Sequence, residues 1–405
     1  MKPDVSWRTD AALYKKFTTL MTLPDAKAVH ELQQDNESVL QMLQRISHDI
    51  SVQTNPSDKL DGFEPLHRLF RAGIAPGVKH GLFQGSGEPG YNVRIEGKET
   101  RNWYGEPEIA RGFDYYHGAT LNLHCGIDDK RQENIELSDA FSPHQISMTS
   151  PNILNMVWHN IGKYIFPWAG KSFEKISPRK LSMLLDESAD LAMRYPERVT
   201  ELKLHPASAP HYLALKADAT MPDAGRHASH LARSWDQGMS LTDKVYWQKQ
   251  ADARYVMGYN LQDKRILAAD AMLKLTDMNY RIPDPVLQTA SASSGSPFAR
   301  QGYAFLGVAD QRSILPMNKA RQVFQFHYRY PLIGGPAPIG YCLDELVEIA
   351  DGLFLGQLIY ATALHLPFNS GIDPANYAYQ LFGYFVLLDD TWEQHRQTIR
   401  LDTLD

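Results

Sequence analysis

The stretch from Gly81 to Tyr91, with the sequence GLFQGSGEPGY, constrains the fold of this chain more than any other segment. It holds four glycines within ten residues, and one large ring, Phe83, lies between the first two. Glycine is unfavourable within a helix. Because it has no Cβ, it suits a strand to which the backbone of another segment comes close. The stretch therefore predicts a small closed β structure with an interior.

Composition limits the classes of protein to which the chain can belong. At 405 residues and 43% hydrophobic content, it can bury a large core, which we expect to form two lobes. A net charge of −6 without a Lys/Arg cluster argues against a nucleic-acid partner. Cys125 and Cys342 are too far apart in sequence for a zinc site built on closely spaced cysteines. The start lacks the apolar core of a signal peptide, and no apolar run is long enough for a membrane span, so we expect a cytoplasmic protein. Whether it forms an oligomer is left open.

Changes of pattern along the chain divide it into four segments. The first is helical, because Val39, Leu40, Met42, Leu43 and Ile46 recur at helical spacing, and Thr54–Asp58 is expected to be a linker. The second and fourth are rich in strands, and the third is read as a helical insertion that covers the β structure. The expected boundaries are 1–55, 56–150, 151–300 and 301–405.

The two β-rich segments carry the clearest strand signals. Tyr115–His124 reads as a strand whose odd positions suit a core, and Arg321–Tyr330 alternates aromatic and mixed residues. Asp351-Gly352 is a strong hairpin signal between two further strands, and Tyr377–Leu388 is another aromatic-rich strand.

The middle segment carries helix signals. Ser177-Pro178 is a good N-cap with a first-turn proline, and an apolar stripe follows it. A long helical segment is expected from Ser240 to about Thr276, and it includes Tyr255 and Met257.

Strands at both ends of the chain around a helical middle indicate an α+β protein. We expect the strands to close into one antiparallel barrel, with the N-terminal helices and the helical insertion outside it. Closure removes exposed strand edges, and such barrels can hold one ligand.

Three motifs resemble those of known barrel families. Gly81–Tyr91 resembles the G-x-W-x-G-x-G signature of the nitrobindin-like, lipocalin-type barrels, with Phe83 in place of the tryptophan. Trp168-Ala-Gly-Lys-Ser-Phe173 is similar to the W-x-G-K-x-F element of the GXWXG proteins, and Asp344–Gly356 is similar to their C-terminal hairpin. The resemblance implies a lipocalin-like barrel that binds a flat or apolar molecule, with haem as one candidate cofactor. A strand histidine near the C-terminus ligates the haem iron in nitrobindin-like proteins, and His327 and His365 lie in that half of this chain.

Glu345 is the best candidate in the chain for a catalytic carboxylate. Strand alternation places it with Tyr341, Leu343, Val347 and Ile349, and burial there would raise its pKa into the range of a general acid or base. The alternative is a charge on an edge strand that prevents aggregation. His327, opposite an aromatic strand face, and a tyrosine such as Tyr328 complete the proposed proton-transfer group.

Aromatic residues and histidines supply the remaining site candidates. Most rings must be core, yet an apolar pocket with a few polar groups is the usual form of a ligand site. His227 and His230, spaced i and i+3, could hold a metal with Asp223 or Asp236, or form a surface pair. The expected ligand-binding residues are Phe83, Tyr91, His117, Phe324, Phe326, Tyr330 and Tyr379.

Three functions remain open at this point. The first is a protein that binds a hydrophobic or aromatic small molecule, or haem, inside the barrel. The second is an enzyme that oxidises, isomerises or cyclises an apolar metabolite. The third is an interaction scaffold whose N-terminal helices bind a partner helix.

Overall fold

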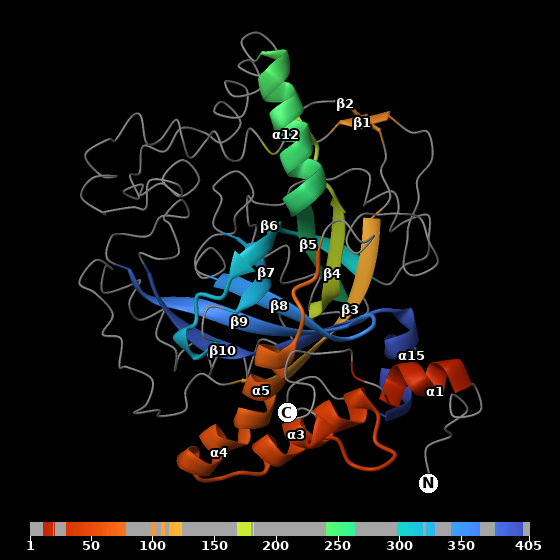
Figure 1. The fold of residues 1–405 in the computed structure, drawn as a ribbon, viewed down its shortest axis with the longest axis vertical. Coiled ribbons are helices and arrows are strands. Elements are labelled where there is room, and N and C mark those ends of the chain that lie inside the picture. Colours follow the sequence, from red (N-terminus) through yellow and green to blue (C-terminus); the bar gives the residue numbers. More distant parts are fainter. Residues whose placement is uncertain are drawn as a thin grey trace.

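A closed barrel of eight antiparallel strands lies at the centre of the computed structural model (Figure 1). The order around the barrel is β10-β3-β4-β5-β6-β7-β8-β9, and β10 pairs with β3 to close it. The strands are β3 (Phe113–Leu123), β4 (Trp168–Lys175), β5 (Tyr255–Asp263), β6 (Phe298–Arg312), β7 (Gln322–His327), β8 (Cys342–Ala350), β9 (Leu353–Leu364) and β10 (Tyr377–Leu388). A separate two-stranded sheet joins β1 (Glu99–Arg101) to β2 (Pro107–Ile109).

The helices lie outside this barrel. They are α1 (Ala11–Thr18), α3 (Val39–Ser51), α4 (Pro56–Gly62), α5 (Glu64–Ala72), α12 (Leu241–Arg254), the short 3-10 helix η4 (Pro316–Asn318) and α15 (Asp390–Ile399). The structure describes residues 11–18, 20, 30–77, 99–101, 107–109, 113–123, 168–179, 181, 240–263, 298–318, 321–328, 342–364 and 377–399. The α+β class and the antiparallel barrel predicted from the sequence are confirmed.

The C-terminal strands form where their sequence patterns predict them. β8 and β9 flank the expected Asp351-Gly352 turn, and Gly352 takes the positive φ of 75° that this hairpin needs. β10 spans the expected Tyr377–Leu388, and it pairs with β3, which lies far earlier in the sequence, with Leu388 opposite His117. Strands distant in sequence therefore close one barrel.

The middle of the chain differs from expectation, because the segment 151–300 supplies β4, β5 and the first residues of β6. The helix that begins near Ser240 ends at Arg254 rather than near Thr276, and Tyr255 and Met257 belong to β5. β5 pairs with β4 on one side and β6 on the other. Long-range strand pairing thus overrides the local helical pattern at this point.

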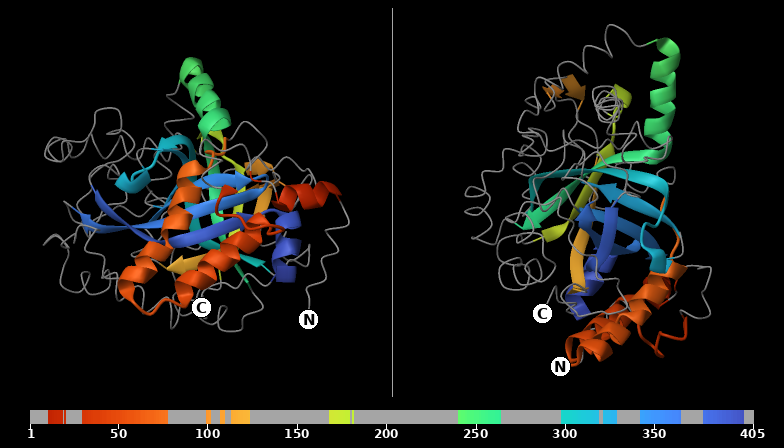
Figure 2. Two further views of the ribbon diagram at one scale, coloured as in Figure 1. Left: turned by 60° about the horizontal axis from the view of Figure 1, so that its bottom comes forward. Right: turned by 90° about the vertical axis from the view of Figure 1, so that its left-hand side faces the viewer.

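The barrel wall separates two hydrophobic clusters. The inner cluster lines the barrel interior with rings such as Phe173, Phe305 and Phe326, and the centroids of Phe305 and Phe326 lie 4.7 Å apart. The outer cluster joins the outward faces of β8, β9 and β10 to the N-terminal helices, which lie against one side of the barrel (Figure 2). Both faces of these strands are therefore buried.

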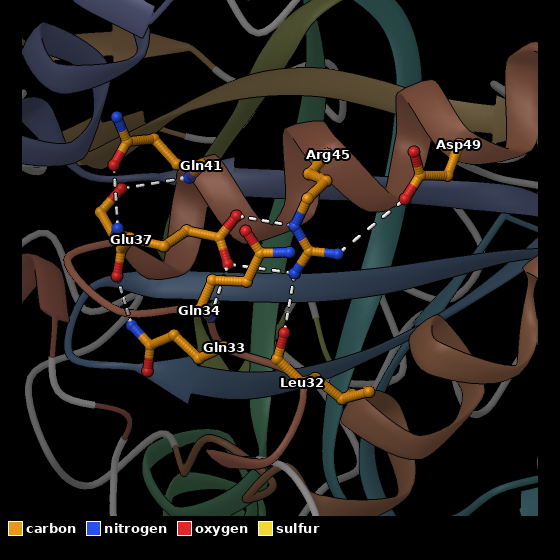
Figure 3. Close-up of polar contacts among 8 residues, drawn as sticks. Leu32, Gln33, Gln34, Glu37, Gln41, Arg45 and Asp49 are labelled. Carbon is orange, nitrogen blue, oxygen red and sulfur yellow. Dashed lines mark hydrogen bonds and ion pairs between the residues drawn. The ribbon is translucent and has the colours of Figure 1, made fainter.

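Capping and ion pairs determine where α3 begins. The Ser38 hydroxyl accepts from the Gln41 amide while the Gln41 side chain accepts from the Ser38 amide, which is a capping box. The Arg45 guanidinium binds both carboxylate oxygens of Glu37, at 2.9 and 3.0 Å, and the Leu32 carbonyl (Figure 3). These contacts fix the turn before the helix.

The apolar stripe predicted on α3 is confirmed, and its residues are buried within this chain rather than presented to a partner. The α3 stripe therefore packs within the chain, and the interaction scaffold stays a hypothesis. Thr54–Asp58 is not a simple linker, because the Asn55 side chain caps α4 by accepting from the Ser57 amide.

Candidate functional site

A bulge in β4 brings Lys171 into the barrel interior. Residues three apart on a regular strand point to opposite faces, yet Trp168 and Lys171 both contact Asn260 on β5. The strand register shifts between Trp168 and Gly170, which means that β4 has one extra residue there. This extra residue brings the side chains of Trp168 and Lys171 to the same face of the strand. Gly170 has a φ of 141°, and a Cβ there would lie 2.0 Å from the Tyr116 carbonyl oxygen, so the bulge requires glycine.

Lys171 bonds to residues on the far side of the barrel. Its Nζ donates to Asp344 Oδ2 at 2.9 Å, to the Tyr328 hydroxyl and to Asn260 Oδ1 at 2.8 Å. β4 and β8 stand opposite each other in the eight-strand ring, so the bond from Lys171 to Asp344 crosses the interior. We call Lys171, Asp344, Tyr328 and Asn260 the Lys171 cluster.

Aromatic rings surround the ammonium of Lys171. The centroid of the Phe305 ring lies 4.8 Å from Nζ and that of Phe326 lies 5.1 Å away, with three more rings between 5.3 and 5.5 Å. Ring faces attract a cation, most strongly where water is excluded. The five rings are Trp168, Phe305, Phe326, Tyr328 and Phe385.

The carboxylate of Asp344 is only partly satisfied. Its Oδ2 accepts from Lys171 and, at 2.7 Å, from the Tyr328 hydroxyl. Its Oδ1 is buried and meets no hydrogen-bond donor among the residues that the structure describes. Lys171 and Asp344 are 3% and 2% exposed, so the pair is withdrawn from water among aromatic rings. Buried polar atoms are normally hydrogen-bonded, which makes this open oxygen a signal of a missing donor.

Glu345 lies outside the barrel, in a second buried polar group. Its carboxylate accepts from the Ser313 hydroxyl, the Ile314 amide at 2.7 Å and the Gln325 side chain at 3.0 Å. Burial raises the pKa of Glu345, as its apolar strand face predicts, although these three donors oppose the rise. The carboxylate holds the segment before η4 against the outer face of the barrel.

Hydrogen bonds continue from this group to helix α5. Asn318 donates to Gln357 Oε1 at 2.7 Å, and Gln357 donates to the Tyr384 hydroxyl at 2.8 Å. The Tyr384 hydroxyl in turn contacts His67 Nδ1 on α5. Burial strongly raises the pKa of Tyr384, so this hydroxyl stays protonated. The outer group thus joins strands to helices as a structural network.

The three predicted catalytic residues do not come together. Tyr328 lies inside the barrel, whereas Glu345 and His327 lie on the outer face, because neighbouring strand residues alternate in direction. The predicted alternation of the Arg321–Tyr330 strand is confirmed, with Phe324 and Phe326 in the inner cluster. His327 is fully buried on the opposite face from Phe326.

His117 also faces away from the interior. Its ring lies 3.5 Å from Asp390 and 3.9 Å from Glu393, both on α15, which packs outside β3. The interior-facing positions of β3 are the even ones, where Tyr116 meets Phe173 and Phe354. The expectation that the odd positions suit a core holds only for the outer cluster, which contains Ala119 and Leu121.

Several predicted site residues lie outside the described part of the chain. Tyr379 belongs to β10, but its side chain is outside that part as well. The others are Phe83, Tyr91, Tyr330, His227, His230 and His365.

The described residues provide no metal centre. No three of their His, Cys, Asp or Glu side chains are grouped to hold a metal ion. His327, the described candidate for a haem ligand, is on the outer face and does not offer an axial ligand to the interior. The haem hypothesis therefore depends on His365.

Comparisons with family models, with curated proteins and with solved structures find no match to this chain. Among the described residues, no helix combines the length and apolar character needed to cross a membrane. The cytoplasmic location stays a prediction, and the oligomeric state stays open.

Sequence reasoning did not identify Lys171, Asp344 and Asn260 as site residues. In the sequence, Lys171 stands out only as part of the Trp168–Phe173 motif, and Asp344 only as the first residue of the Asp344–Gly356 hairpin. One signal was available, because a lysine between Trp168 and Phe173 in a strand suggests a charge held among rings.

Proposed function

We propose that the barrel interior binds an apolar or aromatic small molecule, whose one polar group is recognised at the Lys171 cluster. The observation that carries the proposal is a charged, hydrogen-bonded cluster with one open carboxylate oxygen, enclosed by five aromatic rings. Ligand sites are typically apolar surfaces with a few converging polar groups. The resemblance to lipocalin-like barrels points to the same class of ligand.

A fluorescent apolar probe tests this function. N-phenyl-1-naphthylamine emits strongly only in apolar surroundings, and we expect it to bind the purified full-length protein. Phe326→Leu removes a ring from the inner cluster and should weaken binding about 3- to 10-fold, as expected for the loss of a ring contact. Phe63→Leu makes the same change in the outer cluster and should leave the affinity unchanged.

Two results would contradict the proposal. The probe could fail to bind, or the two variants could change its affinity equally. Native mass spectrometry of the freshly purified protein provides a second test, because a molecule bound in the barrel should be retained and should show lower occupancy in Phe326→Leu.

A second candidate function is acid–base catalysis on the bound molecule. It is favoured by the position of the Tyr328 hydroxyl, which accepts from Lys171 and donates to Asp344. A hydroxyl between a cation and a carboxylate is suited to proton transfer. An enzyme of this kind should catalyse uptake of deuterium from D₂O into a carbon of the retained molecule, and Tyr328→Phe should abolish the uptake without abolishing binding. Uptake that persists in Tyr328→Phe would exclude this role.

A further inference from the structure

The hydrogen-bond donors of Lys171 and Tyr328 are fully used. Each of the three Nζ hydrogens of Lys171 has an acceptor, namely Asp344 Oδ2, the Tyr328 hydroxyl and Asn260 Oδ1. The single hydrogen of the Tyr328 hydroxyl goes to Asp344 Oδ2. A ligand that needs a hydrogen bond from Lys171 or Tyr328 would have to displace one of these partners.

The acceptors of the cluster are not fully used. Asp344 Oδ1 is buried and meets no donor among the described residues, although an ionised carboxylate can accept about four hydrogen bonds. Leaving a buried charged acceptor open is unfavourable, so a molecule that donates there gains affinity. The site therefore has an unused hydrogen-bond acceptor, and a ligand that donates a hydrogen bond would complete it.

Charge balance restricts the ligand further. The ammonium of Lys171 and the carboxylate of Asp344 neutralise each other at 2.9 Å. A charged ligand would add an uncompensated charge among buried aromatic rings, which is strongly unfavourable. A neutral donor adds none.

We propose that the barrel selects a neutral molecule with an apolar or aromatic body and a hydroxyl group, a phenol or an alcohol, whose O–H donates to Asp344 Oδ1. The inference rests on the proposed binding function and names the chemical class of its ligand. Carboxylates and ethers of the same shape are rejected, because the first adds a charge and the second has no donor.

Three probes of one shape separate these classes. Isothermal titration of the full-length protein with 2-naphthol, 2-methoxynaphthalene and 2-naphthoate compares a donor, an ether and an anion on the same rings. We expect 2-naphthol to bind at least 10-fold more tightly than either of the others, because only it completes the hydrogen bonds of Asp344.

Variants locate the preference at Asp344. Asp344→Asn removes the carboxylate charge and should reduce the preference for 2-naphthol over 2-methoxynaphthalene to less than 3-fold. Glu348→Gln makes the same change four residues along β8, where the side chain bonds to the Gly352 amide instead, and should keep the full preference. The comparison of the three probes on the unaltered protein decides the question even if Asp344→Asn does not fold.

The outcomes distinguish the two proposals. Equal binding of 2-naphthol and 2-methoxynaphthalene would overturn the ligand class while leaving the binding function in place. Tightest binding of 2-naphthoate would also overturn it, by placing an anion at Lys171. Failure of all three probes to bind would overturn the binding function and this inference together.

Discussion

Replacing Lys171 by methionine tests whether Lys171 and Asp344 form a true buried ion pair. Methionine has a similar length and no charge, and it would leave the Asp344 carboxylate, 2% exposed, beside Tyr328 alone. Two opposite unit charges about 4 Å apart attract by roughly 4 kcal/mol at an effective dielectric constant of about 20. Removal of one partner of a buried pair typically costs about 3–5 kcal/mol. We therefore expect Lys171→Met to lower the free energy of unfolding by this amount.

A double-mutant cycle measures the interaction itself. Asp344→Asn should cost a similar amount alone, because it leaves a buried ammonium without its carboxylate. The double variant should be more stable than the sum of the single changes predicts, by about 3 kcal/mol. Urea unfolding at pH 7, followed by circular dichroism, gives the four free energies of unfolding.

An exposed ion pair serves as the control for this cycle. Arg71 and Glu64 lie 2.8 Å apart, almost the same separation, but are 25% and 56% exposed. Their coupling energy should be below about 1 kcal/mol. If the Lys171 cycle were additive to within about 0.5 kcal/mol, the reasoning from burial would be refuted.

Two further predictions concern the barrel itself. Burial raises the pKa of Glu348 from 4.5 to about 7, with Asp351 adding to the rise and the Gly352 amide opposing it. Because the folded protein holds this proton more tightly, the free energy of unfolding should fall by up to roughly 3 kcal/mol as pH rises from 4.5 to 7. Urea unfolding across this range should show a smaller fall in Glu348→Gln than in the unaltered protein. A fall of the same size in both proteins would exclude Glu348 as the cause. Gly170→Ala should lower the free energy of unfolding by roughly 3 kcal/mol or more, because alanine is strained at a φ of 141° and its Cβ would overlap the Tyr116 carbonyl; unchanged stability in urea would show that the bulge does not need glycine.

Sequence patterns predicted the elements whose signals are local. Asp351-Gly352 and the alternation on either side of it predicted the β8–β9 hairpin, and the aromatic run of Tyr377–Leu388 predicted β10. β5 was missed because Tyr255 and Met257 continue a helical pattern, and only pairing with β4 and β6 makes them a strand. That information lies far away in the sequence.

Alternation identified shared faces but not the interior. It correctly grouped Phe324 with Phe326, and Glu345 with Leu343 and Val347. Alternation could not show which group points into the barrel, because both faces of these strands are buried. Helices cover the outer face, and aromatic rings cover the inner face. Glu345 was therefore placed on an apolar face that proved to be the outer one.

Strand alternation could not predict the Lys171 cluster for a further reason. Strict alternation places Trp168 and Lys171 on opposite faces, and only the bulge before Gly170 brings them together. Asp344 is 173 residues away from Lys171 and meets it only when the barrel closes. Sites built across a closed barrel depend on register, which the sequence pattern alone does not specify.

A crystal structure of the 405-residue protein with 2-naphthol would show directly whether the barrel binds this ligand. We expect the naphthyl group among the inner rings, with its hydroxyl oxygen within hydrogen-bond distance of Asp344 Oδ1. A probe bound elsewhere on the molecule, or an interior filled by the protein's own side chains so that no ligand enters, would contradict it.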